Sequence, residues 1–382
     1  MTEKAKNVRT GIPPAVKAQL WVAAGGRCEF RGCNKPLDRN VLTQQKVFMG
    51  QHAHIIGDSI EGPRGDATLS KALSQDVSNI MLTCRDCHWT IDRLEKDYSV
   101  EALHEMKRLH EERIQALYDI VDTKESVPLV LRHPIRGHVP QFTMKDVHGA
   151  IFANSRFAQM PGVKAIDIDY RTRAARETDP DYWSELVRQL ESDYQAQMHH
   201  VGLAKAPEHI SVFAFAPIPL LMQLGAFMGN KSPAAVYQWM RSTESWKFPT
   251  ERAADRQFCQ ADVVPPSDGT GELALLLSFS GEVDVAAVER AVPGLPRVRF
   301  GLPSPTPAFV EDAEDIRHFR SRLTELLAAI RNAGYRTVHV FPATSLALSV
   351  EFGRQLLPKA DARMEIWDYQ HGDFVRALRL KV

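Results

Sequence analysis

Two closely spaced cysteine pairs are the feature that most constrains how this chain can fold. Cys28 and Cys33 form a C-x4-C pair, and Cys84 and Cys87 form a C-x2-C pair. Together they can supply four thiolates to one tetrahedral Zn²⁺ ion with no coordination position left open, as in structural rather than catalytic zinc sites. Four unrelated buried cysteines would rarely pair so closely. The pattern therefore predicts a zinc ion that joins two separate segments.

Length, composition and charge describe a folded protein of several domains. The 382 residues are enough for two or three domains, and the 44% hydrophobic and 25% charged residues are typical of globular chains. Lys plus Arg and Asp plus Glu both total 47, so any binding of nucleic acid must come from a local patch. Residues 1–14 lack the apolar core of a secretory signal, and no apolar run is long enough to span a bilayer. We expect a cytoplasmic protein that does not enter a membrane.

Polar residues between and after the cysteine pairs form a second pattern. The chain reads Gln51-His52-Ala53-His54, then Asn79 and a short apolar run to Cys84, then Cys87-His88 and Asp92. Over about residues 18–95 the sequence resembles the HNH, or ββα-metal, endonuclease family in its zinc-stapled form. The resemblance implies an α+β zinc-stapled ββα-metal domain and an enzyme that hydrolyses phosphodiester bonds of double-stranded DNA.

The resemblance assigns a role to each matching residue. His54 would be the general base, since a neutral imidazole can take a proton from water near neutral pH. Asn79 would hold either the loop or the His54 ring in position. His88 and Asp92 are four residues apart on one helix face, so both can bind one Mg²⁺ or similar divalent ion.

One position departs from the family pattern. Many members have Asp or His directly before the general base, as a metal ligand, and this chain has Ala53 there. His52 lies one residue further back and shares a strand face with His54. His52 is our candidate for the missing ligand, provided that the strand bends.

Seven basic residues around the motif are available to hold a phosphate backbone, and no segment resembles a base-reading helix, so we expect little sequence specificity. They are Lys35, Arg39, Lys46, Arg64, Lys71, Arg85 and Arg93.

The chain divides near residue 125. A helix is expected to begin after Ser99 as its N-cap and to end the first domain, residues 1–125. Residues 126–140 contain three prolines and are interpreted as a linker. In residues 141–382, strands (163–170, 210–216, 273–279, 337–341, 363–367 and 375–380) alternate with helices (182–199, 217–225, 283–291, 315–333 and a helix to 357). This alternation predicts an α/β domain with a largely parallel sheet.

Two stretches of the second domain resemble each other. Residues 212–217 and 338–342 each read as a strand ending in proline, followed by a helix that reaches Gly225 or Gly353. Either any two β-α units look this similar, or the domain consists of two Rossmann-like halves. In such sheets ligands bind beyond the carboxyl ends of the strands.

The same stretches, with residues 237–246 and 351–354, resemble the SAVED domain over about residues 140–382. The resemblance implies two fused CARF-like Rossmann units that bind a cyclic dinucleotide or trinucleotide. Joined to an HNH unit, it implies an effector of CBASS anti-phage defence.

Binding such a ligand requires aromatic rings for its bases and cations or N–H groups for its phosphates. Our candidates are Tyr237, Trp246, Lys231, Arg241, Lys247 and Thr344, with Phe227 as a further ring. Trp246 could instead be a core residue, and Tyr237 with Arg241 a surface stack.

We therefore expect a DNA endonuclease that is activated by a cyclic oligonucleotide and forms a homo-oligomer when the ligand binds. The alternative is a modification-dependent HNH restriction endonuclease whose C-terminal domain reads DNA. A third hypothesis, a non-catalytic zinc module that binds DNA, leaves His54, Asn79 and His88 without a role.

Overall fold

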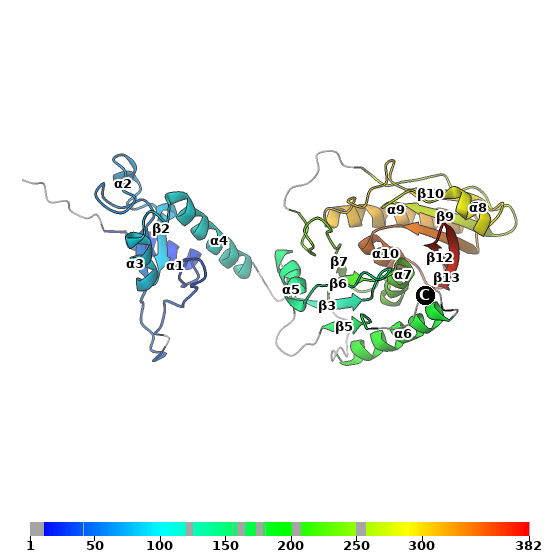
Figure 1. Cartoon of the computed structure of the whole chain (residues 1–382), viewed down its shortest axis with the longest axis horizontal. Coiled ribbons are helices and arrows are strands. Elements are labelled where there is room, and N and C mark those ends of the chain that lie inside the picture. The colour runs from blue at the N-terminus through cyan, green and yellow to red at the C-terminus, as the bar shows by residue number, and fades with distance from the viewer. Residues whose placement is uncertain are drawn as a thin grey trace, which may run out of the picture. The chain divides into compact units, whose positions relative to one another are not determined.

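The computed structural model divides into two compact units, Met1–Val121 and Asp122–Val382 (Figure 1). The residues that the structure describes are 11–40, 42–119, 125–154, 156–158, 165–172, 179, 181–200, 208–249 and 257–381.

The N-terminal unit has a two-stranded sheet followed directly by a helix. Strands β1 (Gln51–His54) and β2 (Ile80–Thr83) are antiparallel, and His54 lies opposite Ile80. Cys84 is the N-cap of helix α3 (Arg85–Arg93). The other elements are α1 (Pro14–Ala23), α2 (Leu69–Ala72) and the 3-10 helix η1 (Val77–Asn79). The order strand, strand, helix is the one expected from the sequence.

Helix α4 (Val100–Tyr118) ends the described part of this unit. As expected, Ser99 is its N-cap, and the Ser99 Oγ accepts a hydrogen bond from the Ala102 N–H at 3.2 Å. Polar side chains are buried along the helix together with apolar ones. Lys107 pairs with Glu111 at 2.6 Å and lies 3.8 Å from the buried Glu29. Burial raises the pKa of Glu29 to about 8. The helix is thus attached to the unit by a polar contact as well as by apolar packing.

The expected linker over residues 126–140 is wrong for its first half. Residues 125–132 form strand β3 (Glu125–Arg132), which is almost wholly buried and pairs in parallel with β6 (Ile210–Phe215). Pro128 stands inside this strand. Prolines are typical of linkers, but residues 126–131 are otherwise mostly apolar, as central parallel strands are.

The C-terminal unit contains two sheets. The first has the order β4-β3-β6-β7, with β5 also on β3, and its pairings are all parallel. The second, β13-β12-β11-β9-β10-β8, is parallel from β12 to β10 and antiparallel at both edges. The remaining strands are β4 (Phe157–Ala158), β5 (Ile166–Asp169), β7 (Ala234–Val236), β8 (Gln260–Ala261), β9 (Glu272–Ser278), β10 (Arg297–Gly301), β11 (Thr337–Ala343), β12 (Arg363–Gln370) and β13 (Asp373–Arg379).

The two sheets are built on the same plan, which confirms the hypothesis of two Rossmann-like halves. The first half has the strand order β5-β3-β6-β7, and the second has β10-β9-β11-β12. In each half, each of the first three of these strands along the chain is followed by a helix. In the first half, α5 (Met144–Ala153), α6 (Tyr182–His200) and α7 (Ile218–Met228) come after β3, β5 and β6. In the second half, α8 (Val285–Ala291), α9 (Ala313–Asn332) and α10 (Leu346–Arg354) come after β9, β10 and β11. The first half begins with β3, inside the expected linker.

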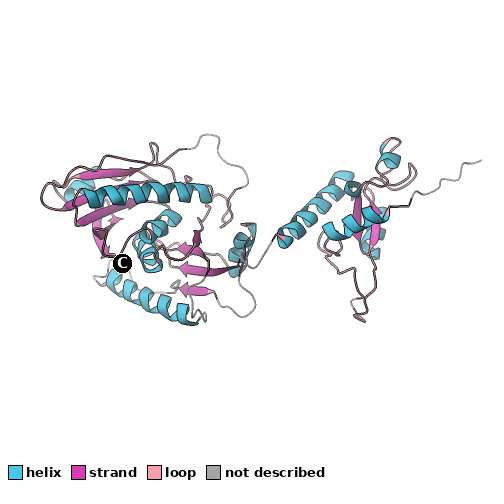
Figure 2. Ribbon diagram, turned by 180° about the vertical axis from the view of Figure 1, so that it is seen from behind, coloured by secondary structure: helices cyan, strands magenta, loops and turns pink. Residues whose placement is uncertain are grey.

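Helices α7 and α10 lie side by side between the sheets (Figure 2). Each follows the third strand of its half, and one apolar cluster includes Leu220 and Leu224 of α7 and Leu348 and Phe352 of α10. The halves therefore share one hydrophobic core. Pro342 lies within β11, so the counterpart of Pro217 at the helix N-cap is Ser345.

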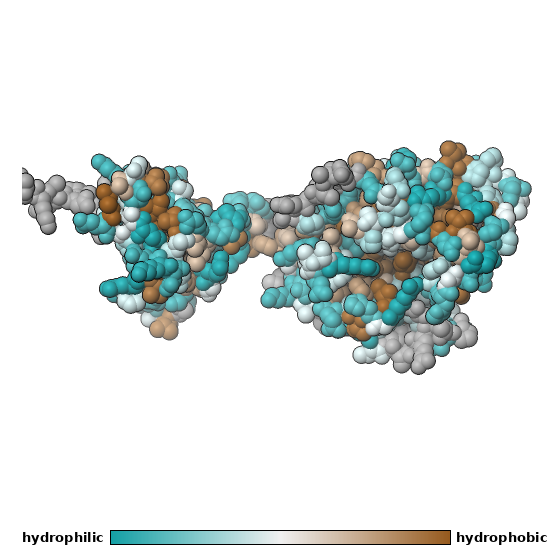
Figure 3. Space-filling view, turned by 45° about the horizontal axis from the view of Figure 1, so that its top comes forward, coloured by the Kyte–Doolittle hydropathy of each residue, from teal (hydrophilic) through white to brown (hydrophobic). Residues whose placement is uncertain are grey.

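The surface carries no exceptional apolar area in the view of Figure 3, where hydrophilic side chains cover most of the visible face of each unit and apolar ones are scattered. Among the helices that the structure describes, none is both long and apolar enough to cross a bilayer.

Candidate functional site

The four cysteines of the N-terminal unit come together in space. The sulfur atoms of Cys28, Cys33, Cys84 and Cys87 all lie within 4.8 Å of one another, and none is in a disulfide. The Sγ atoms of Cys33 and Cys84 are 3.9 Å apart. The Cys84 N–H donates to the Cys28 Sγ at 3.2 Å, a contact that favours a negatively charged sulfur. The sequence spacing therefore identified this cluster correctly.

The cluster fits a tetrahedral Zn²⁺ ion in size and in chemistry. With Zn–S bonds of about 2.3 Å, the sulfurs of a tetrahedral site lie about 3.8 Å apart, close to the Cys33–Cys84 separation. Burial raises the pKa of the Cys28 thiol to about 12 and also raises that of Cys87. The Cys28 and Cys87 thiols therefore stay protonated unless a cation stabilises the thiolates, whereas hydrogen bonds from neighbouring groups outweigh burial at Cys84 and lower its pKa.

His54 lies at the end of β1, and one of its ring nitrogens is fixed by the backbone. Its Nε2 is 2.9 Å from the carbonyl oxygen of Ser74. Because a carbonyl oxygen can only accept, Nε2 must carry the proton, and Nδ1 of the neutral ring then has the lone pair. His54 is therefore held in the tautomer that can accept a proton at Nδ1.

Asn79 is completely buried and contacts the loops on both sides of His54 rather than its ring. Its Oδ1 accepts from the Ile56 N–H at 2.9 Å, and its Nδ2 donates to the Ile56 carbonyl at 3.0 Å. Nδ2 also lies 3.3 Å from the carbonyl oxygen of Leu73, the neighbour of Ser74. Of the two expected roles, these contacts favour holding the loop.

His88 and Asp92 face the same side of α3. The His88 Nε2 and the Asp92 Oδ2 are 3.3 Å apart, and both side chains are partly exposed. Adjacent ligands of an octahedral Mg²⁺ with bonds of about 2.1 Å lie about 3 Å apart, so this pair fits a shared ion. Burial alone would raise the pKa of Asp92, but hydrogen bonds from His88 and Arg64 more than offset it, and the pKa is lowered.

Arg64 is a structural residue rather than one of the expected phosphate-binding cations. Its side chain is 6% exposed and pairs with the Asp92 Oδ1 at 3.1 Å. The guanidinium also donates to the carbonyl oxygens of Ile55 and Ile91, each at 2.7 Å. Arg64 thus ties the chain after His54 to the C-terminal turn of α3. No local sequence pattern indicates that Arg64 is buried.

Ala53 and His52 occupy opposite faces of β1. Ala53 is fully buried in an apolar cluster with Met81, Ile91 and Leu103, so the position of the missing ligand faces the core. Burial, followed by the charges of Lys17, His54 and His88, lowers the pKa of His52. Within the described residues, however, the cysteines are the only convergent group of three or more potential ligands. His52 stays a candidate.

In the C-terminal unit, the two aromatic residues expected to stack on ligand bases are core residues instead. Trp246 is 0% and Tyr237 is 1% exposed. The Tyr237 ring stacks on Phe213 with centroids 4.2 Å apart, and the Trp246 ring meets Phe142 edge-on at 5.0 Å. Because the rings are enclosed by apolar side chains, this expectation is wrong. The alternative that Trp246 is a core residue is confirmed.

The remaining expected ligand contacts are divided between the surface and the interior. Lys231, Arg241 and Lys247 are exposed. Thr344 is buried at the end of β11, and its Oγ1 lies 2.7 Å from the Ser349 Oγ of α10. Phe227 is partly buried and stacks on Tyr194. Of these residues, only the three cations reach the surface, while Thr344 and Phe227 pack against neighbouring side chains.

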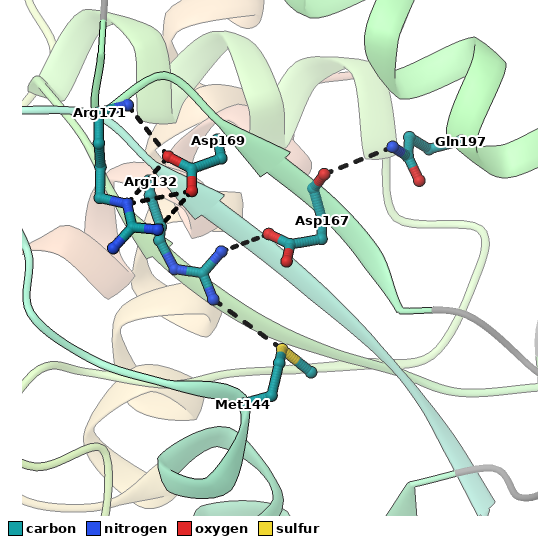
Figure 4. A network of polar contacts seen from close by, with 6 residues as sticks. All are labelled: Arg132, Met144, Asp167, Asp169, Arg171 and Gln197. Atoms are coloured by element: carbon teal, nitrogen blue, oxygen red, sulfur yellow. Dashed lines mark hydrogen bonds and ion pairs between the residues drawn. The ribbon is translucent and has the colours of Figure 1, made fainter.

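Buried polar residues that the sequence analysis missed lie where strands end. Arg132, the last residue of β3, is 4% exposed and pairs with Asp167 of β5, while Asp169 is held by Arg171 (Figure 4). The Arg132 guanidinium also lies over the Phe142 ring, 4.9 Å from its centroid. Arg132 escaped notice because it falls inside the expected linker.

Gln238 is a second missed residue, and it connects the two halves. It follows β7 of the first half, and its Oε1 accepts from the Ala347 N–H in the first turn of α10 at 3.0 Å. An amide oxygen of one half therefore caps the N-terminal end of a helix in the other.

Comparison with known proteins identifies the C-terminal unit. Residues 192–380 match the family model of the SAVED domain, described as a SMODS-associated sensor domain fused to various effectors. Among solved structures, the Cap4 SAVED/CARF-domain containing receptor of Acinetobacter baumannii with the cyclic trinucleotide 3'3'3'-cAAA is 11% identical, with a TM-score of 0.43 over 84% of this chain and 68% of that one. The Cap4 receptor of Moraxella osloensis is 12% identical, with a TM-score of 0.41 over 77% and 60%. No curated protein matches the sequence. The C-terminal unit therefore contains a SAVED sensor domain, built on an α/β fold with two largely parallel sheets.

Proposed function

We propose that this chain is a metal-dependent DNA endonuclease of the HNH type, activated by a cyclic oligonucleotide that its SAVED domain binds, and that it acts in anti-phage defence. The nuclease assignment rests on the arrangement of His54, His88 and Asp92 on two strands and a helix. The four-cysteine cluster lies where the second strand passes into this helix. A module that only binds DNA has no need of a histidine held in one tautomer on a strand that contacts a helix with a His–Asp pair.

In this proposal His54 is the general base. Its Nε2 donates to the Ser74 carbonyl, so Nδ1 takes a proton from the attacking water. Asn79 acts as a positioning residue through its hydrogen bonds to Ile56 and Leu73.

His88 and Asp92, with His52 as a further candidate, would hold the catalytic divalent ion. When bound, Mg²⁺ stabilises negative charge on the phosphate and on the leaving oxygen. The four cysteines would hold a structural Zn²⁺, which keeps β2, α3 and the segment around Cys28 together.

The activator is proposed to be a cyclic dinucleotide or trinucleotide. The match to the SAVED family model supports a ligand that activates the enzyme, because that family is described as a sensor domain fused to effectors. A ligand can switch an enzyme only by binding its active arrangement more tightly than its resting one. An ungated nuclease with little sequence specificity would cut the chromosome of its own cell, so we propose that the resting state is inactive.

Digestion of plasmid DNA with Mg²⁺, with and without a panel of cyclic oligonucleotides, tests the assignment. We expect cleavage only with an activating cyclic oligonucleotide. His54→Ala should lower the rate at least 10²-fold, the usual contribution of a general base. His148→Ala, which changes an exposed histidine of α5, is the matched control. Cleavage by His54→Ala at the wild-type rate would remove His54 from the mechanism, and dependence on DNA methylation instead of the cyclic oligonucleotide would favour the restriction endonuclease.

We further propose that ligand binding is coupled to cleavage through self-association, which can bring two nuclease units to the two strands of one duplex. Light scattering with the activating cyclic oligonucleotide should then give a higher mass than without it. Full ligand-dependent cleavage by a particle of unchanged mass would refute the assembly step and leave the nuclease assignment intact.

A further inference from the structure

Helix α3 has an exposed surface that the proposed catalytic residues do not use. Arg85, Trp89 and Arg93 are spaced four residues apart, so their side chains form one stripe along the helix. Trp89 is 65% exposed, which is unusual for tryptophan. The Arg93 guanidinium lies 5.5 Å from the centre of the Trp89 ring. We call this stripe the α3 surface.

The α3 surface adjoins the proposed catalytic residues. Trp89 follows His88 in the chain, and Arg93 follows Asp92, so the stripe lies next to the His88–Asp92 face of the same helix. The opposite side of the helix packs into the core through Ile91, which is 0% exposed. A molecule lying along the α3 surface is therefore within reach of the His88–Asp92 pair.

The local charge favours an anionic partner. Arg85 and Arg93 stand at the two ends of the stripe, about 12 Å apart along the helix axis. The neighbouring carboxylate of Asp86 is paired with Lys35 at 3.3 Å, and that of Asp92 with Arg64.

Resting on the proposed nuclease function, we propose that the α3 surface is where the substrate DNA strand is held. Arg85 and Arg93 contact phosphates, and the indole of Trp89 stacks on a base or a deoxyribose between them. Stacking on an aromatic ring tolerates any base, because every base has a π face. The surface therefore adds affinity without sequence specificity.

Fluorescence anisotropy of a labelled DNA duplex tests this surface separately from catalysis. Binding is measured on the full-length His54→Ala chain, with Ca²⁺ replacing Mg²⁺, in the presence of the activating cyclic oligonucleotide, or of each member of the panel if no activator is found. Adding Trp89→Ala should weaken binding about tenfold, within the range for loss of one stacked base. Trp89→Phe, which keeps an aromatic ring, should restore most of the affinity. Leu117→Ala, at an exposed apolar residue of α4, should leave it unchanged.

The arginines have their own readout. Arg85→Gln and Arg93→Gln should each reduce the slope of log affinity against log salt concentration by about one, as expected for loss of a phosphate contact. Arg108→Gln, at an exposed arginine paired with Glu105 and Glu112, is the control and should not change the slope. In the cleavage assay, Trp89→Ala in the otherwise wild-type chain should raise KM more than it lowers kcat.

Two results would overturn the proposal: DNA affinity that is unchanged in Trp89→Ala, or affinity that falls equally in Leu117→Ala. Loss of self-association with unchanged DNA affinity would assign the surface to a protein partner instead. If Trp89-dependent DNA binding occurs but the wild type cleaves nothing under any condition, the surface stands and the nuclease proposal fails.

Discussion

Gly225 of α7 and Gly353 of α10 each lie against the backbone of the other's helix. A Cβ added to Gly225 would overlap the carbonyl oxygen of Val350, and one added to Gly353 would overlap that of Met222. Each glycine stands seven residues after the start of its helix, so the contact is reciprocal. The two halves of the sensor domain are thus joined at corresponding positions of corresponding helices.

Replacing either glycine should destabilise the C-terminal unit. In Gly225→Ala or Gly353→Ala the new methyl group meets backbone atoms, which only a shift of one helix can relieve, and we expect a loss of at least 1–3 kcal/mol. Thermal unfolding followed by circular dichroism measures the effect. Gly281→Ala, where a Cβ would meet nothing within 4 Å, is the control. A wild-type melting temperature in Gly225→Ala would mean that the helices do not approach this closely.

The zinc proposal predicts one tightly held zinc ion per chain, measured by elemental analysis after exhaustive dialysis. Cys87→Ser should lower the zinc content and the melting temperature of the N-terminal unit, because the metal contributes folding free energy. Cys259→Ser, in the other unit, should leave the zinc content unchanged. Purified wild-type protein without zinc would refute the proposal.

Trp246→Ala should destabilise the sensor domain by about 3–5 kcal/mol, the usual cost of deleting a large buried aromatic side chain. The ring is fully buried between Phe142 and Phe213, so the main effect is on folding rather than on ligand contact. Differential scanning calorimetry checks this, and Trp367→Ala, at a partly buried ring, should cost less. An unchanged melting temperature with a selective loss of ligand affinity would return Trp246 to the binding site.

The sequence predicted those parts of the structure that depend on local pattern. The cysteine spacing identified the four-cysteine cluster, and the strands and helix beside it follow one another in the order that the resemblance implied. Most strands and helices after residue 181 were also predicted, because apolar runs and caps are local signals, but strands β7 and β10 were not.

The sequence analysis failed where tertiary context decides. Strand β3 was read as a linker because Pro128 and its flanking prolines outweighed the apolar residues between them. Tyr237 and Trp246 were read as ligand contacts, since the sequence of an aromatic cluster does not reveal which rings face inward. Arg64 was counted among exposed cations, and only its hydrogen bonds to backbone carbonyls reveal its burial.

The last prediction concerns His209, a buried histidine that belongs to neither the cysteine motif nor the HNH motif. Its Nδ1 is 2.8 Å from the Ser126 Oγ, which lies 2.7 Å from the Ser211 Oγ. Burial, helped by the charges of Arg156 and Arg354, lowers the pKa of His209 from 6.5 to about 4. The folded protein therefore keeps this ring neutral at pH values where the unfolded chain binds a proton.

The sign of the pH dependence follows from this difference. Above pH 6.5 both states are neutral at His209, and the residue adds no slope to stability. Between pH 6.5 and about 4 the unfolded state takes up a proton that the folded state does not, so the free energy of unfolding falls as the pH falls. Urea unfolding of the full-length chain at a series of pH values should show this loss for the C-terminal unit. His209→Gln should flatten the profile over that interval, and a variant profile as steep as that of the wild type would show that another group causes the loss.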